Sequence, residues 1–224
     1  MKIKTKGKCA KCDKMYGAAQ AGTHLLKCVL QSDTPSKSMT EGYFIRISWA
    51  EQPGMYWIFA TIPKNASLSL LDAFLRGTWL ECCGHLSEFT IEGRSYMSHT
   101  DSGNHNQSMK NQVGKLLSPG SVCEYVYDMG SSTDLEIRVL GEVHTCPQKK
   151  VTILMQNDPP NLPCESCKKT ANIICSQCGD TICDACSERH SCVVDEDDDY
   201  MLMSLVNSPR AGVCGYEGNE MYDN

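Results

Sequence analysis

The C-terminal part of the chain carries eight potential metal ligands within 29 residues, and this pattern limits the possible folds more than any other feature. Three Cys-x2-Cys pairs are followed by a histidine and one more cysteine. The ligands are Cys164, Cys167, Cys175, Cys178, Cys183, Cys186, His190 and Cys192. Eight ligands make two tetrahedral zinc sites. The only large apolar residues among them are Ile173, Ile174 and Ile182, so metal must supply the folding free energy of this segment.

The spacers between these ligands are similar to those of B-box and related cross-brace zinc fingers. That resemblance implies a crossed pairing. In it, one ion is held by Cys164, Cys167, Cys183 and Cys186, and the other by Cys175, Cys178, His190 and Cys192. A sequential pairing uses the same ligands and stays open. The short last spacer makes Cys192 the weakest of the eight assignments. Protein ligands fill every coordination position, which indicates structural rather than catalytic zinc.

A further ligand pattern lies near the N-terminus, where Cys9, Cys12, His24 and Cys28 have the spacing C-x2-C-x11-H-x3-C. The histidine and the last cysteine are four residues apart, so they share one face of a helix expected from about residue 18. Tyr16 stands where a small ββα finger has its aromatic core residue. We therefore predict a C2HC-type zinc finger over residues 1–32, and about three Zn²⁺ per chain in total.

Charge is distributed unevenly along the chain. Residues 1–30 contain seven lysines against Asp13 alone, whereas the remainder has a net charge of −12 within the total of −6. Only the N-terminal segment can therefore attract phosphates. The base-reading positions of a finger of this type would fall near Gly17, Gln20 and Thr23, with no arginine to read guanine. Nucleic-acid association through residues 1–30 is possible, but sequence-specific reading is not favoured.

The central residues 41–156 have the patterns of an α+β domain with a mostly antiparallel sheet and one or two helices. Alternating apolar residues predict strands over residues 43–49, 56–62, 122–127, 135–143 and 151–155, and a short hairpin turning at residues 92–93. One amphipathic helix is expected after a cap at Asn65 or Ser67, ending at Gly77. Small zinc-stapled modules flank this domain.

Two stretches of the central region carry a family resemblance. The run from Trp79 through Cys82-Cys83-Gly84-His85 to Phe89, and the later Tyr125-x-Tyr127-Asp128-Met129-Gly130-Ser131, resemble the plasmid open-reading-frame-three-like family. Its members are often labelled passenger proteins of an insertion element. The resemblance spans residues 43–143, with Met129 and Ser131 where the family has phenylalanine and aspartate. It implies a fold and no particular activity.

The predicted organisation has four segments: a finger at residues 1–32, an α+β domain at 41–156, a B-box-like double-zinc module at 162–194, and an acidic hinge with a C-terminal tail at 195–224. The proline-rich residues 157–163 mark the main boundary. No apolar run approaches the ~20 residues that span a bilayer, and no hydrophobic segment follows the N-terminal lysines. We therefore expect a cytoplasmic protein, in which a content of 15 cysteines points to metal binding, by ten of them, rather than to disulfides.

Outside these ligands, only Cys82 and Cys83 with His85 have the composition of a nucleophilic site. The sequence favours buried core thiols here, because the segment ends an amphipathic helix. Whether the tail brings Cys214 near other sulfurs is open. The leading hypothesis is a zinc-binding interaction or adaptor protein that binds another protein. The alternatives are a nucleic-acid-associated accessory of a mobile element and a cysteine-dependent enzyme.

Overall fold

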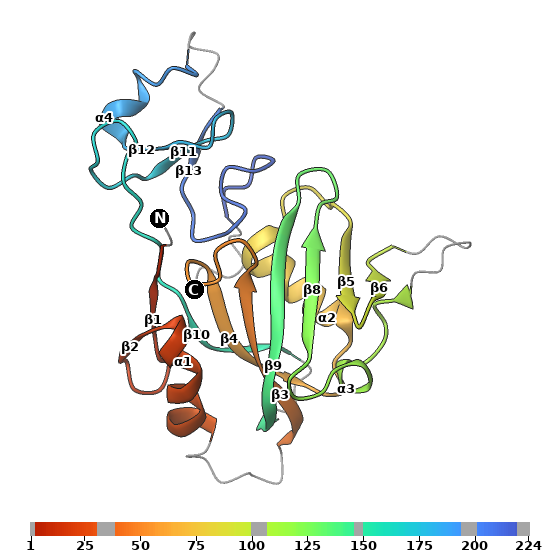
Figure 1. Ribbon diagram of the computed structural model, residues 1–224. Coiled ribbons are helices and arrows are strands. Elements are labelled where there is room, and N and C mark those ends of the chain that lie inside the picture. The colour runs from red at the N-terminus through yellow and green to blue at the C-terminus, as the bar shows by residue number, and fades with distance from the viewer. Residues whose placement is uncertain (1–2, 31–38, 100–106, 146–149, 194–200, 219–224) are drawn as a thin grey trace. The chain divides into compact units, whose positions relative to one another are not determined.

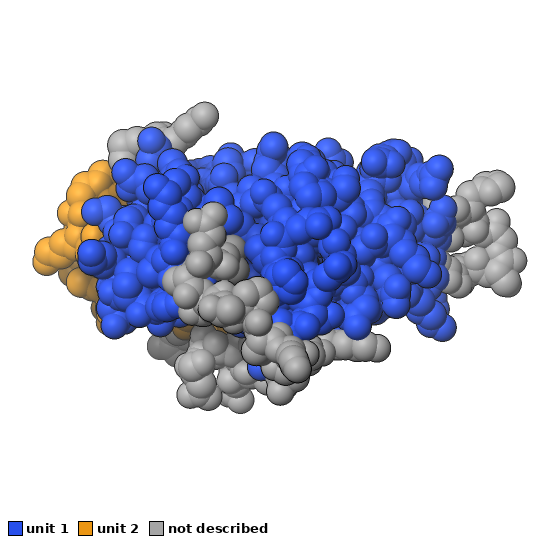
Figure 2. Space-filling view, turned by 90° about the horizontal axis from the view of Figure 1, so that it is seen from below, with its two compact units in different colours: residues 1–76, 85–158 blue, residues 77–84, 159–224 orange. Residues whose placement is uncertain are grey.

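The computed structural model describes residues 3–30, 39–99, 107–145, 150–193 and 201–218. By contacts the chain divides into two compact units, which Figure 2 shows in different colours. Unit 1 comprises residues 1–76 and 85–158, and unit 2 comprises residues 77–84 and 159–224. The N-terminal finger segment therefore lies in the same unit as the central domain. The acidic run at residues 195–199, expected as a hinge, lies outside the described residues.

The core of unit 1 is a sheet that has eight strands among the described residues (Figure 1). In spatial order they are β10 (Thr152–Gln156), β4 (Trp57–Pro63), β3 (Thr40–Trp49), β9 (Thr133–Thr145), β8 (Val122–Tyr127), β5 (Ser87–Ile91), β6 (Arg94–Met97) and β7 (Gln107–Ser108). All neighbouring pairs are antiparallel except β6 and β7. Every residue of β4 is buried, as expected for a strand covered on both faces. The predicted α+β class with a mostly antiparallel sheet is confirmed.

The finger segment forms β1 (Lys6–Lys8), β2 (Met15–Gly17) and α1 (Ala18–Leu25), which continues as a π-helical turn, η1 (Leu26–Leu30). It does not stand apart from the sheet. Ala21 and Leu25 on α1 are fully buried and belong to one apolar cluster with Phe44, Trp57 and Phe59. Finger and sheet therefore share a hydrophobic core.

Helix α2 (Leu68–Leu75) begins as the sequence predicts, because the hydroxyl oxygen of Ser67 accepts a hydrogen bond from the N–H of Leu70. The predicted stop at Gly77 is wrong. The chain continues through that glycine as a π-helical turn, η2 (Arg76–Leu80). This continuation of the helical turn is favourable because it buries the side chains of Trp79 and Leu80 completely. A short helix, α3 (Val113–Leu116), follows β7.

A buried carboxylate joins α2 to the sheet of unit 1. Asp72 on α2 accepts hydrogen bonds from the hydroxyls of Ser87 in β5, at 2.6 Å, and Tyr125 in β8, at 2.8 Å. Its other oxygen lies 3.0 Å from Nε of Arg76. The charge is thus paired and fully hydrogen-bonded, as a buried carboxylate must be.

Unit 2 contains a three-stranded sheet in the order β12 (Thr181–Ile182), β11 (Ile173–Cys175) and β13 (Leu202–Ser204), and the short helix α4 (Asp184–Ser187). Three of the five buried residues in its apolar cluster are cysteines. Residues 77–84 pack with the C-terminal tail, where Ser208 donates a 2.6 Å hydrogen bond to the carbonyl of Trp79. None of the helices in the described ranges is long and apolar enough to cross a membrane.

Candidate metal centres

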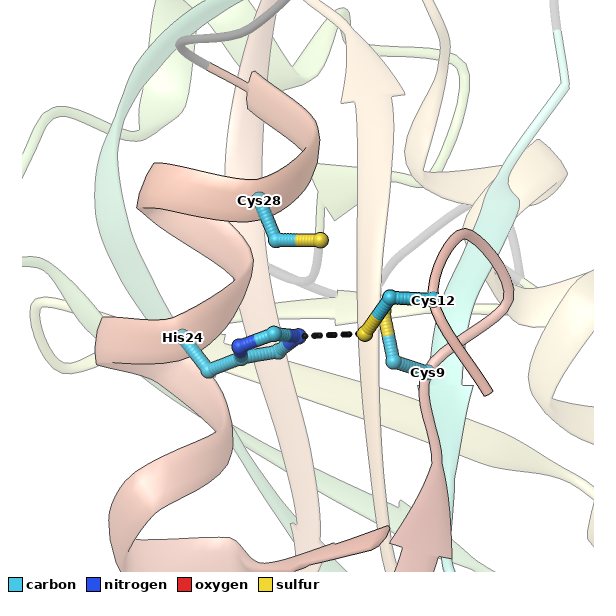
Figure 3. A group of neighbouring side chains, drawn as sticks. All are labelled: Cys9, Cys12, His24 and Cys28. Carbon is cyan, nitrogen blue, oxygen red and sulfur yellow. Dashed lines mark hydrogen bonds between the residues drawn. The ribbon is translucent and has the colours of Figure 1, made fainter. Parts of the chain in front are cut away.

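The four ligands predicted for the finger converge in unit 1. Cys9 and Cys12 lie on the turn between β1 and β2, His24 on α1 and Cys28 on η1, and their side chains point toward one another (Figure 3). All four ligand atoms lie within 4.8 Å of one another. Nε2 of His24 is 3.4 Å from Sγ of Cys12. The ring of Tyr16 stacks on the His24 imidazole at 4.0 Å between centroids, which fixes the orientation of the imidazole.

The turn that carries Cys9 and Cys12 has a defined backbone pattern. The N–H of Cys9 donates to the carbonyl of Lys14, and the N–H of Asp13 donates to the carbonyl of Cys9, both at 3.0 Å. Asp13 has a positive φ of 59°. This left-handed residue reverses the chain directly after the second cysteine, so that both sulfurs face the same side.

The same turn occurs twice more in unit 2. The N–H of Cys164 donates to Lys169 at 2.6 Å and that of Cys175 donates to Asp180 at 2.9 Å. The left-handed positions are Lys168, with φ 63°, and Gly179, with φ 79°. Three Cys-x2-Cys pairs thus adopt one conformation, whereas the fourth pair, Cys183 and Cys186, lies at the start of α4.

The eight C-terminal ligands form two groups in crossed order. One group is Cys164, Cys167, Cys183 and Cys186, and the other is Cys175, Cys178, His190 and Cys192. Within each group the ligand atoms lie within 4.8 Å of one another. Sγ of Cys167 is 3.5 Å from Sγ of Cys183, and Nε2 of His190 is 3.3 Å from Sγ of Cys178. Cys192, the weakest assignment by spacing, lies with its expected partners.

Hydrogen bonds across the first turn account for the crossed order. The N–H of Glu165 donates to the carbonyl of Thr181 at 2.8 Å, and the hydroxyl of Thr181 donates to the carbonyl of Pro163 at 2.8 Å. Because Thr181 is two residues before Cys183, these bonds hold the first Cys-x2-Cys turn beside α4. The turn at Cys175 follows β11 and meets the ligands that come after α4.

Backbone N–H groups favour the thiolate form of the first sulfur in both turns of unit 2. The N–H of Cys167 is the largest influence on Cys164, and with other N–H groups it lowers the pKa of that thiol to about 6. Burial is the largest influence on Cys175 and raises its pKa. The N–H of Cys178 and further hydrogen bonds outweigh this, which leaves the pKa at about 7. Both pKa values lie below the usual value of 9.0.

The finger shows a contrast between its sulfurs. The backbone N–H of Lys14 lowers the pKa of Cys12, whereas burial, followed by hydrogen bonds to Cys12 and Cys9, raises the pKa of Cys28 to about 11. A thiolate at one cysteine therefore opposes loss of the proton from a neighbouring cysteine. A divalent cation removes this effect, because coordinated thiols lose their protons.

A fourth group gathers residues that the sequence did not predict as ligands. Cys82, Cys83 and Cys214 of unit 2, with His85, two residues after Cys83 in the chain, have ligand atoms within 4.8 Å of one another. The expectation of buried core thiols is wrong. Cys82 is half-buried and Cys83 is exposed. Trp79 and Leu80 are the fully buried residues of this segment, and the chain returns to the surface after them.

The fourth group also lacks the character of a nucleophilic site. Hydrogen bonds with Cys214, and then with Cys82, raise the pKa of Cys83 to about 12. A nucleophilic cysteine needs the opposite shift, toward the thiolate. The sequence signal that points to this group is the ligand-rich run Cys-Cys-x-His, but its fourth member is 131 residues away from Cys83.

Comparisons with known proteins assign no family to this chain. No family model matches the sequence, and no curated protein matches it. Among solved structures, one match is the "Crystal Structure of Protein of Unknown Function MM3350 from Methanosarcina mazei Go1". It has 16% sequence identity and a TM-score of 0.46, and the match covers 54% of this chain and 70% of that chain.

Proposed function

We propose that this chain is a zinc-binding interaction protein, in which zinc is structural and the partner is another protein. The observation that carries the proposal is the gathering of the eight C-terminal ligands into two complete groups of four. Thiolate and imidazole donors in groups of four select zinc over magnesium or calcium, which prefer oxygen ligands. Thiolate ligands need a reducing environment, so the proposal also places the chain in the cytoplasm.

A structural role follows from the ligand count and from the size of the core. Each group supplies four protein ligands, which leaves no coordination position for a substrate or a catalytic water. Among the described residues, the buried members of the apolar cluster of the double-zinc module are Ala171, Ile182 and three cysteines, and a few partly buried apolar side chains such as Ile173 and Leu202 pack against them. So small a core does not fold by itself, and the metal supplies the difference.

The surface charge of the double-zinc module favours a protein partner over nucleic acid. Its exposed and half-buried charged residues include Lys168, Lys169 and Arg189, which are balanced by Glu165, Asp180, Asp184 and Glu188. A balanced surface does not attract a phosphate backbone, which binds through concentrated positive charge. The mixed charges suit polar recognition of a protein surface instead.

The alternative of nucleic-acid association is supported by one face of the finger. Lys4, Lys6 and Lys8 are exposed, and they alternate along the chain with buried residues, so they share one outward face. On α1 the side chains of Gln20 and Thr23 are exposed. This arrangement suits contacts to phosphates without base reading. The resemblance to insertion-element passenger proteins would give such binding a context.

A capture experiment with matched variants separates the two candidates. The tagged full-length chain is cross-linked in native lysate, with and without nuclease and over a series of salt concentrations. We expect one protein to be captured after nuclease treatment and at high salt, and Cys175→Ser to abolish its capture. The triple variant Lys4→Gln, Lys6→Gln and Lys8→Gln should leave capture unchanged. Capture that is lost with nuclease and with the lysine variant would replace our proposal with the alternative.

A further inference from the structure

We propose that Cys82, Cys83 and Cys214, with His85, form a fourth zinc site, separate from the three predicted by the sequence. The inference does not depend on the protein partner proposed above. Sγ of Cys83 lies 3.7 Å from Sγ of Cys82 and 3.6 Å from Sγ of Cys214. Zn–S bonds of about 2.3 Å in a tetrahedron place the sulfurs roughly 3.8 Å apart, which matches these distances. A disulfide would need a separation of about 2.05 Å.

The donor types equal those of two of the other three groups. Three sulfurs and one imidazole are also the set of the finger and of the group around His190. His85 reaches the cysteines through the chain itself, because only Gly84 separates it from Cys83. Its Nε2 lies 3.5 Å from the carboxylate of Asp128. Metal-binding histidines usually have such a carboxylate beside the second ring nitrogen, which orients the ring.

A buried cation within unit 2 completes the charge balance. Three thiolates around Zn²⁺ leave one net negative charge. Arg210 is fully buried, and its Nη2 lies 3.5 Å from Sγ of Cys82. A guanidinium is buried only where negative charge or hydrogen bonds compensate it. The arginine next to the sulfur therefore favours the thiolate form, which is the form that binds metal.

The backbone of the tail is fixed so that Cys214 faces the other two thiols. The hydroxyl of Ser208 donates to the carbonyl of Trp79 at 2.6 Å and accepts a hydrogen bond from the N–H of Arg210 at 2.8 Å. Cys214 itself has a φ of 52°, a left-handed conformation that is unfavourable for a non-glycine residue. Such strain at a potential ligand is expected where the surrounding structure or a bound metal holds the residue in place.

The test counts metal ions in the full-length chain, purified under reducing conditions from cells supplied with zinc. We expect elemental mass spectrometry to find four zinc ions per chain, and Cys214→Ser should lower the number to three. The matched control is Cys123→Ala, which changes a buried cysteine of β8 outside all four groups and should leave four ions. Three ions in the unchanged protein, or no loss in Cys214→Ser, would overturn the proposal.

A second measurement uses the unchanged protein, so a folding defect in a variant cannot affect its result. After exchange with ¹¹³Cd, the NMR spectrum reports the number of sulfurs on each ion. We expect one resonance of the four-sulfur class and three of the three-sulfur class. A spectrum without the third resonance of that class, together with a disulfide between Cys83 and Cys214 in the non-reduced protein, would make this group a redox pair. The three sequence-predicted sites would be unaffected by that result.

Discussion

Trp57 in β4 donates its indole N–H to the hydroxyl oxygen of Thr5 over 2.9 Å, and this hydrogen bond ties the N-terminal finger segment to the sheet of unit 1. The same hydroxyl lies 2.8 Å from the carbonyl of Met55, to which it can donate its proton. Both side chains are buried. The bond links residues 52 positions apart, and both residues belong to unit 1, in which the finger and the sheet share an apolar cluster.

Replacing Thr5 with valine tests this link. Thr5→Val keeps the shape of the side chain but removes the acceptor of the Trp57 N–H, and leaving such a buried donor unsatisfied costs about 1–3 kcal/mol. We expect the free energy of unfolding to fall by that amount in urea, followed by tryptophan fluorescence. The control is Thr23→Val on the exposed face of α1, for which a change within about 0.5 kcal/mol is expected. Equal losses in the two variants would contradict the prediction.

The sequence predicts those features of this chain that depend on local spacing. The helix that carries His24 follows from the ligand spacing, and the strands of the large sheet other than β7 follow from alternation and turn residues. The crossed grouping in unit 2 is implied by the resemblance of its spacers to those of cross-brace fingers. That these groups hold zinc stays a prediction. Ser67 could be named as one of two candidate caps, with Asn65, because capping needs only a short polar side chain close before the N–H groups of the first turn.

Features that join distant parts of the chain could not be predicted in this way. The pairing of Phe44 and Phe59 with Leu25 depends on which apolar faces meet, and many pairings satisfy the same pattern. Gly77 failed as a stop signal because burial of Trp79 outweighs the local cost of a glycine within a helical turn. The position of Cys214 is set by the hydrogen bonds of the tail, which no spacing encodes.

Gly7 should tolerate a side chain far less well than Gly17, which lies on the other strand of the finger hairpin. A Cβ at Gly7 would overlap the carbonyl oxygen of Gln156 and lie 2.8 Å from the ring of Trp57, because β1 approaches the backbone of β10 closely. Gly7→Ala should therefore separate the finger from the sheet and lower the melting temperature by several degrees. Gly17→Ala is the matched control, since its Cβ would meet only the carbonyl of Thr5, at 3.7 Å. Differential scanning calorimetry measures both, and similar melting temperatures would exclude the close approach.

Loss of metal should affect the two units differently. Cys175→Ser removes a ligand that is also part of the small core of unit 2, so the double-zinc module should unfold and release about two zinc ions. The thermal transition of unit 1 should persist. Cys12→Ser should instead lower the melting temperature of unit 1, because Cys12 packs against the apolar cluster that contains Cys9 and Leu25. Calorimetry with parallel metal analysis checks this prediction. A single merged transition that both variants shift would mean that the units fold together.

Acid should release metal from the double-zinc module in a definite pH range. The pKa of Cys164, at about 6, and that of Cys175, at about 7, lie below the value of 9.0 for an unfolded thiol. Their stabilising contribution is complete above pH 9 and is lost as the pH falls through these two values. Since metal further opposes protonation, zinc should be retained at neutral pH and released below about pH 6. A chromogenic chelator follows the release. Substantial loss of zinc above pH 8 would contradict this sign.

The three equivalent Cys-x2-Cys turns differ in the residue that occupies their left-handed position. Gly179 holds this position in one turn and Lys168 in another, with φ values of 79° and 63°. A side chain at such a φ costs about 1–2 kcal/mol, and glycine avoids that cost but loses about 0.5–1 kcal/mol of chain entropy. Lys168→Gly should therefore stabilise the module by up to about 1 kcal/mol relative to Lys168→Ala. The alanine variant is the matched control, because both changes remove the exposed ion pair with Glu165.

The reverse change completes the comparison. A Cβ at Gly179 would meet no atom within 4 Å, so Gly179→Ala introduces backbone strain without a clash. It should destabilise the module by about 1 kcal/mol, and the double variant with Lys168→Gly should recover most of that loss if the two turns contribute independently. Unfolding must be measured at one fixed concentration of free zinc, because bound metal raises the apparent stability. If Lys168→Gly were less stable than Lys168→Ala, the metal-bound turn would hold this residue in a conformation other than the left-handed one.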